Sequence, residues 1–276
     1  DSTVDLPAEL RARTTVVPLV VRFGEEEYQD GVTISYQQFY EKLNAGAEVS
    51  TSQPFPADLT ELWGQLLETH DAVVYIPMSS ALSGSCGVAK AVAAEEFPGR
   101  VFVADNRRIS VTQRHAVLEA KAMAERGTDA AAIAARLEET ALRASIYISV
   151  STMKYLKKGG RISKTVAFAG GMLNIKPVLS IVDGEINMLG KARGSKQGNN
   201  LLRVLVEKSG GIDFDRPLCL AYSGLSDMML RKYIEDSEEL WQGHDDCLQI
   251  ATVGCAIGTH AGPGAVAVAF FVNSNS

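Results

Sequence analysis

Two hydroxyl-rich segments in the first third of the chain carry side chains that could bind an anion. Thr51 and Ser52 follow a predicted helix and come shortly before Pro54, which favours extended geometry, so we expect their hydroxyls to point into a loop. The serine-rich run 79–85 follows a predicted strand and opens a predicted helix, which places Ser83 beside free N–H groups at a helix N-terminus. Such donors suit a carboxylate, although turn and capping serines are equally typical of stability alone.

Two further side chains with chemical potential lie in glycine-rich segments. His260 lies within the run 258–264, where we expect a tight loop between two strands that could bring the imidazole close to a ligand. Arg161 follows two lysines and two glycines, and its planar guanidinium is suited to a flat oxyanion. Taken alone, both patterns are also typical of solvated surface loops.

Ser83 and His260 allow a serine-dependent acyl hydrolase, with Ser83 as nucleophile and His260 as its base. The chain has no Gly-x-Ser-x-Gly elbow, and spacing singles out no acidic residue to orient His260. It also has no GxxxxGK[ST] phosphate loop, so kinase activity of its own is not indicated. A binding module or sensor for an amphiphile is the alternative that needs no nucleophile.

Five ordered motifs together resemble the DegV family of bacterial lipid-binding proteins, which have the EDD fold. The central signature is 159–163 followed by 174–177, and the other motifs are 51–54, 79–84, 191–194 and 258–264. The resemblance covers nearly the whole chain. It implies an α/β protein of two domains, in which an N-terminal three-layer α/β/α domain has a parallel sheet and a C-terminal two-layer domain has a mixed α/β sheet.

The resemblance also implies a ligand, a long-chain fatty acid buried between the two domains, with no other cofactor and no metal. The residues that would hold its carboxyl group are Thr51, Ser52, Ser83 and His260. The chain departs from the family pattern at several positions. Ser85 replaces threonine and keeps a hydroxyl, Ala261 replaces threonine and loses one, and Thr112 and Arg114 stand where the family has glycines.

A partner is implied as well, because the better-understood members of the family present the carboxyl to a separate ATP-dependent fatty acid kinase that makes acyl phosphate. The chain is therefore expected to be a non-catalytic subunit of fatty acid kinase in phospholipid metabolism. Arg161 matches an arginine that lies beside the pocket and serves docking to the kinase. Lys176 and Arg193 match family positions without a derivable role, and we expect structural ion pairs for both.

Composition and charge argue against nucleic-acid binding, a zinc or disulfide site and a membrane segment. The net charge is −6, from 27 basic and 33 acidic residues, so no broad basic surface is available and nucleic acid is not an expected partner. The four cysteines have no CxxC spacing, which favours reduced, buried thiols over a zinc site or disulfides. With no signal-peptide pattern and no apolar run near the roughly 18 residues of a membrane span, we expect a cytoplasmic protein without a membrane segment.

Alternating strand and helix patterns must position these residues. The first half is predicted to contain strands at 15–23, 72–76 and 101–104 and helices at 35–46, 58–69, 84–96, 111–125 and 129–141. The second half is predicted to contain strands at 146–150, 178–182, 186–189, 218–223, 248–253 and 265–271 and helices at 195–207 and 226–240, with a hairpin turn at Asp183-Gly184. We place the domains at 1–148 and 149–276. Because the family opens with a buried strand, we expect the first strand upstream of residue 1.

Overall fold

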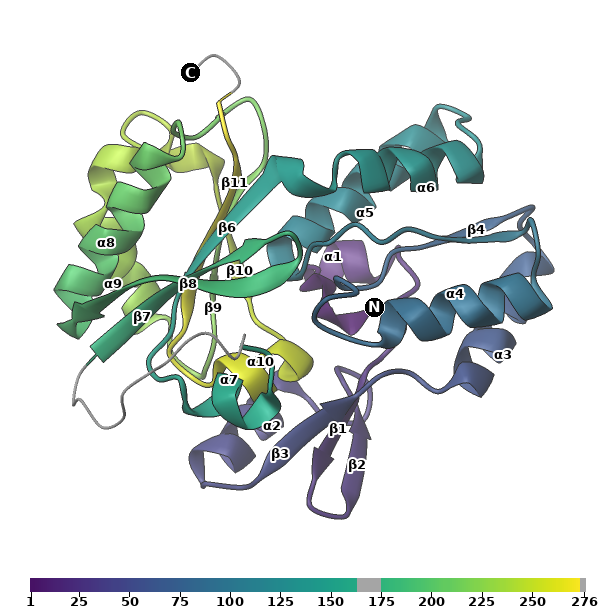
Figure 1. Cartoon of the computed structure of the whole chain (residues 1–276), viewed down its shortest axis with the longest axis horizontal. Helices are drawn as coiled ribbons and strands as arrows, with labels where there is room; N and C mark the ends of the chain where they lie inside the picture. Colours follow the sequence, from purple (N-terminus) through teal and green to yellow (C-terminus); the bar gives the residue numbers. More distant parts are fainter. Residues whose placement is uncertain (163–174, 274–276) are drawn as a thin grey trace.

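The computed structural model describes residues 1–162 and 175–273, and it shows two halves that lie side by side (Figure 1). Ser163 and Asn174 of the central signature lie outside the described residues. Within the described part of the chain, no helix is long and apolar enough to cross a membrane.

A parallel pair of strands lies between two layers of helices in the N-terminal half. Its elements are β4 (Val73–Tyr75), β5 (Val101–Val103), α3 (Pro56–Leu67), α4 (Ser85–Glu96), α5 (Ser110–Glu125) and α6 (Ala130–Glu139). Side chains alternate along a strand, so Tyr75 packs against Trp63 with α3 and α4, while Ile76, just beyond β4, packs against α5 and α6. The predicted α/β/α architecture is confirmed.

An antiparallel sheet that the sequence did not predict precedes this layer. Its elements are β1 (Val20–Phe23), β2 (Glu26–Gln29) and β3 (Val49–Ser52), in the order β2-β1-β3, with α2 (Tyr36–Asn44) between β2 and β3. Ser35 begins α2 with a capping box to Gln38. Thr51 and Ser52 are the last residues of β3, paired with β1, so their predicted place in a loop is wrong. The polar run Val-Ser-Thr-Ser has no apolar alternation from which a strand could be predicted.

The C-terminal half is a six-stranded mixed sheet with helices on one face. Its elements are β6 (Ala144–Ser149), β7 (Ile175–Val182), β8 (Glu185–Arg193), β9 (Leu218–Tyr222), β10 (Leu248–Thr252), β11 (Val266–Phe271), α8 (Gly194–Lys208) and α9 (Met228–Asp236). The strand order is β10-β9-β11-β6-β7-β8; β9 and β10 are parallel and the other pairs antiparallel. This confirms the predicted mixed two-layer architecture.

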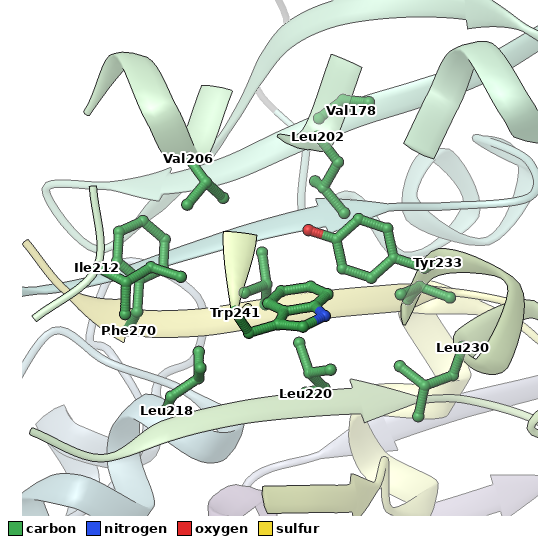
Figure 2. Packing of buried hydrophobic residues seen from close by; sticks show 12 residues of the cluster. Val178, Leu202, Val206, Ile212, Leu218, Leu220, Leu230, Tyr233, Trp241 and Phe270 are labelled. Atoms are coloured by element: carbon green, nitrogen blue, oxygen red, sulfur yellow. The ribbon is translucent and has the colours of Figure 1, made fainter. Parts of the chain in front are cut away.

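The two faces of this sheet differ in the size of their side chains. On the helix-covered face, Leu220 and Phe270 pack with Tyr233 and Trp241 in a dense apolar core (Figure 2). Neighbouring residues in a strand point to opposite sides, and on the opposite face β9 and β11 carry small residues such as Ala221 and Ala267, beside larger aliphatic residues of β6 such as Ile146. The small residues leave space between this part of the sheet and the N-terminal half.

Two short helices stand where the sequence predicted loops. They are α7 (Lys154–Gly159) and α10 (Cys255–Ala261), which lie next to each other (Figure 1). His260 is thus on a helix rather than in a loop, and the correction follows from Asp30, whose carboxylate accepts hydrogen bonds from the N–H groups of Cys255 and Ala256 at the start of α10. Such a cap comes from a residue distant in sequence, so the local pattern could not indicate it.

The remaining short elements are η1 (Ser2–Val4), α1 (Ala8–Arg11), η2 (Ala141–Arg143), η3 (Glu238–Leu240) and η4 (Asp245–Cys247). A domain boundary at 148 stays a prediction; β6 belongs to the six-stranded sheet, so a boundary before Ala144 would keep that sheet whole. A strand upstream of residue 1 also stays a prediction.

Candidate functional site

An apolar cavity lies between the uncovered face of the six-stranded sheet and the N-terminal half. The sheet contributes Ile146, Ile148, Leu179, Ile181, Ile186, Ala221 and Ala267, the N-terminal half contributes Leu19, Met78, Leu82 and Ile109, and the segment after β10 contributes Val253, Ala256 and Ile257. Most of these side chains are aliphatic. The cavity is therefore suited to an apolar ligand rather than to a polar metabolite.

Several polar side chains line this cavity, and one of them is His260, near the C-terminal end of α10. Thr51 Oγ1 lies 2.8 Å from His260 Nε2, which joins β3 to α10 across 209 residues of sequence. Ser83 lines the same cavity from the turn before α4, and its hydroxyl accepts a hydrogen bond from the N–H of Ser85 at 3.1 Å. Ser52 lines it as well, and its buried hydroxyl has no partner among the described residues. All four predicted carboxyl-binding residues thus border one cavity.

His260 is held by its hydrogen bond to Thr51 and by close packing against α7. A Cβ atom added to Gly159 would lie 2.0 Å from His260 Nδ1, so the backbone of α7 lies directly against the imidazole. Burial, and to a smaller extent the charge of Arg161, lowers the pKa of His260 to about 4. The imidazole is therefore neutral at pH 7, and His260 can offer a hydrogen bond but no charge to a ligand.

Comparison with known proteins decides the family. A family model described as uncharacterised proteins of the DegV family matches residues 1–273. The chain belongs to the DegV family. A DegV domain-containing protein of Deinococcus radiodurans is 36% identical over 276 residues, which are 98% of this chain and 95% of the relative.

Solved DegV structures share the whole fold with this chain. A fatty-acid-binding DegV family protein from Thermus thermophilus is 33% identical, with a TM-score of 0.85 over 99% of this chain and 98% of the other. A stearic-acid-binding protein from Eubacterium ventriosum is 25% identical, with a TM-score of 0.84 over 99% and 96% of the two chains. DegV from Bacillus subtilis, a fatty acid binding protein, is 27% identical, with a TM-score of 0.80 over 99% and 97%.

Arg161 does not lie on a solvated loop, which is what its local sequence alone suggested. The side chain is half-buried and lines the apolar cavity together with His260. Its Nε donates to the carbonyl of Leu82 at 3.3 Å and its Nη1 to the carbonyl of Gly159, so the guanidinium bridges the Ser83 turn and α7. Arg161 is thus placed beside the predicted carboxyl group, and its role in docking stays a prediction.

The ion pairs expected for two other DegV-motif residues are wrong for the described part of the chain. Lys176 Nζ donates to Ser151 Oγ at 3.2 Å, and burial lowers the pKa of its ammonium group. Arg193 ends β8 with an exposed side chain, and its backbone N–H bonds to Gln197.

The departures from the DegV pattern at Ala261, Thr112 and Arg114 fall at two places in the structure. Ala261 lines the cavity, so the missing hydroxyl makes the wall near His260 more apolar. Thr112 bonds to the backbone of Ile109 at the start of α5. Arg114 is buried and donates to the backbone carbonyl of Asp5.

A buried polar pair beside the cavity was missed by the sequence analysis. Ser110 lines the cavity and its hydroxyl donates to the carboxylate of Asp5 at 2.5 Å, while Asp5 also accepts a hydrogen bond from Gly254 N–H at 2.8 Å. Burial raises the pKa of the Asp5 carboxyl group to about 7, against the opposing effect of these two hydrogen bonds. More than 100 residues separate Asp5 from each partner, so no local pattern could have joined them.

Proposed function

We propose that this chain binds a long-chain fatty acid, with the acyl chain in the apolar cavity and the carboxyl group beside Thr51, Ser83 and His260. The observation that supports this most is the shared cavity, which is aliphatic along its walls and polar around α10. Members of the same family with the same fold bind fatty acids. Ser52 and Arg161 border the same polar region and complete the proposed carboxyl site.

The apolar and polar regions of the cavity contribute differently to the binding free energy. Burying a sixteen-carbon chain at about 0.8 kcal/mol per CH₂ contributes on the order of 10 kcal/mol before ordering costs. One neutral hydrogen bond contributes about 1 kcal/mol. The acyl chain therefore supplies most of the affinity, while the hydroxyls and Arg161 fix the position of the carboxyl group.

We further propose that the bound carboxyl group is presented to a separate ATP-dependent fatty acid kinase. The chain then acts as a binding subunit, and the transfer of the phosphoryl group takes place on the partner. The arrangement of Ser83 supports a binding role, because its hydroxyl bonds to Ser85 while the His260 ring bonds to Thr51. No carboxylate among the described residues is hydrogen-bonded to His260, as a hydrolase triad would require.

Native mass spectrometry of the purified chain, followed by titration with hexadecanoate, tests this function. A co-purifying fatty acid and saturable binding are the expected results. Ser83→Ala should weaken binding by about 1–3 kcal/mol, since a partner of a buried charge is lost. Ser80→Ala is the matched control, because Ser80 is exposed in the same turn and bonds to Asp105 instead. Unchanged affinity in Ser83→Ala would remove Ser83 from the site, and ester cleavage that Ser83→Ala abolishes would favour the hydrolase.

A further inference from the structure

Ser110 lines the apolar cavity at a distance from the proposed carboxyl site. Its hydroxyl donates to the carboxylate of Asp5 at 2.5 Å, and Asp5 accepts a hydrogen bond from the N–H of Gly254 at 2.8 Å, so Ser110 lies beside the start of α10. His260 lies near the other end of the same helix. Because an α-helix rises 1.5 Å per residue, Gly254 and His260 are about 9 Å apart along its axis.

Along the cavity wall, the neighbours of Ser110 are aliphatic. Ile109 precedes Ser110, Val253 precedes Gly254, and both of these side chains line the cavity. Ser110 therefore adds a separate polar position to the aliphatic part of the cavity. The other polar lining residues belong to the segments that carry the proposed carboxyl site, namely 51–53, Ser83, Arg161 and His260.

Both members of the Asp5–Ser110 pair have a backbone conformation that favours glycine. The φ angles of Asp5 and Ser110 are +46° and +57°, and both side chains are buried. Such strain persists only where the surroundings hold the residue in place. The hydrogen bond between the two side chains also fixes what Ser110 can offer a ligand. Because its O–H donates to Asp5, the oxygen of Ser110 is left as an acceptor.

We propose that the cavity binds a long-chain fatty acid with a hydroxyl group on the middle of its acyl chain, and that this hydroxyl donates to Ser110 Oγ. This inference rests on the proposed function and adds a ligand class to it. A hydroxyl that is buried against apolar walls without a partner weakens binding, so one acceptor at a fixed depth selects the position of the hydroxyl. An oxo group carries no proton to donate and does not fit this contact.

The position of the hydroxyl follows from the depth of Ser110 in the cavity. An extended chain advances about 1.2 Å per bond, since three backbone bonds span up to about 3.6 Å. The length of about 9 Å along α10 therefore corresponds to about seven or eight bonds. The expected ligand carries its hydroxyl on about carbon 8 to 10, counted from the carboxyl carbon.

Titrations with octadecanoate and with octadecanoates that carry a hydroxyl on carbon 6, 8, 10 or 14 test the inference. They are made at pH 8.5, because burial raises the pKa of Asp5 to about 7 and the ionised carboxylate can only accept. The 8- or 10-hydroxy acid should bind within about threefold of octadecanoate, and the 6- and 14-hydroxy acids about tenfold more weakly. The oxo acid of the preferred position should bind about tenfold more weakly than its hydroxy acid.

Ser110→Gly removes the hydroxyl and suits the backbone, since glycine adopts a positive φ without strain. It should weaken binding of the preferred hydroxy acid about tenfold and change octadecanoate affinity by less than about threefold. Thr112→Val is the matched control, because Thr112 bonds to the backbone of Ile109 at the start of α5 and is not a lining residue of the cavity. It should leave both affinities unchanged.

The ligand series uses the unaltered protein, so it decides the inference independently of the folding of any variant. Equal affinity for the four hydroxy acids, a preference for the oxo acid, or equal losses of both ligands in Ser110→Gly would overturn the inference. If the unaltered protein binds octadecanoate but all hydroxy acids bind more than about tenfold more weakly, the inference alone fails. If it binds none of these acids, the proposed function fails.

Discussion

Gly159 shows how one residue fixes the geometry of the polar region. Its lack of a side chain allows α7 to approach His260, whose Nε2 is then directed at Thr51. Gly159→Ala should displace the imidazole, because the new methyl group would lie 2.0 Å from Nδ1. We expect a loss of hexadecanoate affinity of about 1–3 kcal/mol, as for the removal of a buried hydrogen bond, measured by titration.

Gly64→Ala is a suitable control for Gly159→Ala. Gly64 is also helical, and a Cβ atom there would have open space around it. The control should bind hexadecanoate normally. Normal binding by Gly159→Ala would show that the position of His260 does not matter for the ligand.

His115 makes the stability of the fold sensitive to acid. It is buried against Phe271 near Arg108 and Arg114, and burial followed by these charges lowers its pKa to about 3. At pH values between about 3 and 6.5, His115 binds a proton in the unfolded chain but not in the folded one. The contribution of His115 to the free energy of unfolding is therefore fully present above pH 6.5 and is lost as the pH falls. For this group alone the loss is about 2 kcal/mol at pH 5.

His115→Phe should therefore reduce the difference in unfolding free energy between pH 7 and pH 5 by about 2 kcal/mol. Urea titrations at the two pH values measure this difference. His70→Gln is the control, because His70 is exposed, and it should leave the difference unchanged. An unaltered pH dependence in His115→Phe would mean that His115 does not carry the acid sensitivity.

At the scale of single elements, the β7–β8 hairpin connects the two halves of the molecule. Ser79 Oγ donates to the carbonyl of Gly184 at 2.9 Å and Arg107 Nη1 to that of Asp183 at 3.1 Å, so the tip of the hairpin is attached to the turn that carries Ser83. A Cβ atom on Gly184 would lie 2.3 Å from Ser79 Oγ. The hairpin also contributes Ile181 and Ile186 to the cavity wall.

Gly184→Ala should detach the hairpin tip and weaken hexadecanoate binding. Its φ of +82° adds strain for any side chain, so Gly127→Ala, with a φ of +78° and open space around it, is the matched control. We expect Gly184→Ala to destabilise the fold by about 1–2 kcal/mol more than the control, because a buried contact is lost in addition to the strain. Equal unfolding free energies of Gly184→Ala and Gly127→Ala would show that the contacts of the hairpin tip contribute nothing to the stability of the fold.

Elements with a local signature could be predicted from the sequence, and elements fixed by distant contacts could not. The Asp183-Gly184 turn between two apolar runs indicated the hairpin, which the structure confirms. β3 and α10 were missed because their stability comes from β1 and from Asp30. The same limit applies to the site: the resemblance singled out residues that border one cavity, whereas the contacts of Arg161 and the Asp5–Ser110 pair required the fold.

Across the whole molecule, Arg161 joins the proposed lipid site to the surface. It lines the apolar cavity and also a cavity between β3 and α7. Arg161→Ala should therefore weaken hexadecanoate binding by about 1–3 kcal/mol, because a charged partner of the carboxyl group is lost. This differs from the expectation for a residue that serves docking alone, which would leave lipid affinity unchanged. Titration with hexadecanoate separates the two roles, and Arg193→Ala, which changes an exposed arginine away from both cavities, serves as control.

The capping of α10 determines when, during synthesis of the chain, the polar region of the cavity can form. Asp5 and Asp30 bind the backbone of 254–256, and Thr51 meets His260, so each of these contacts spans more than 200 residues. A chain under synthesis emerges from its N-terminus, and its N-terminal half can begin to fold first. The polar region can be assembled only after His260 has left the ribosome. A chain that still lacks His260 could therefore not bind the proposed fatty acid through this site, so loading would follow the synthesis of α10.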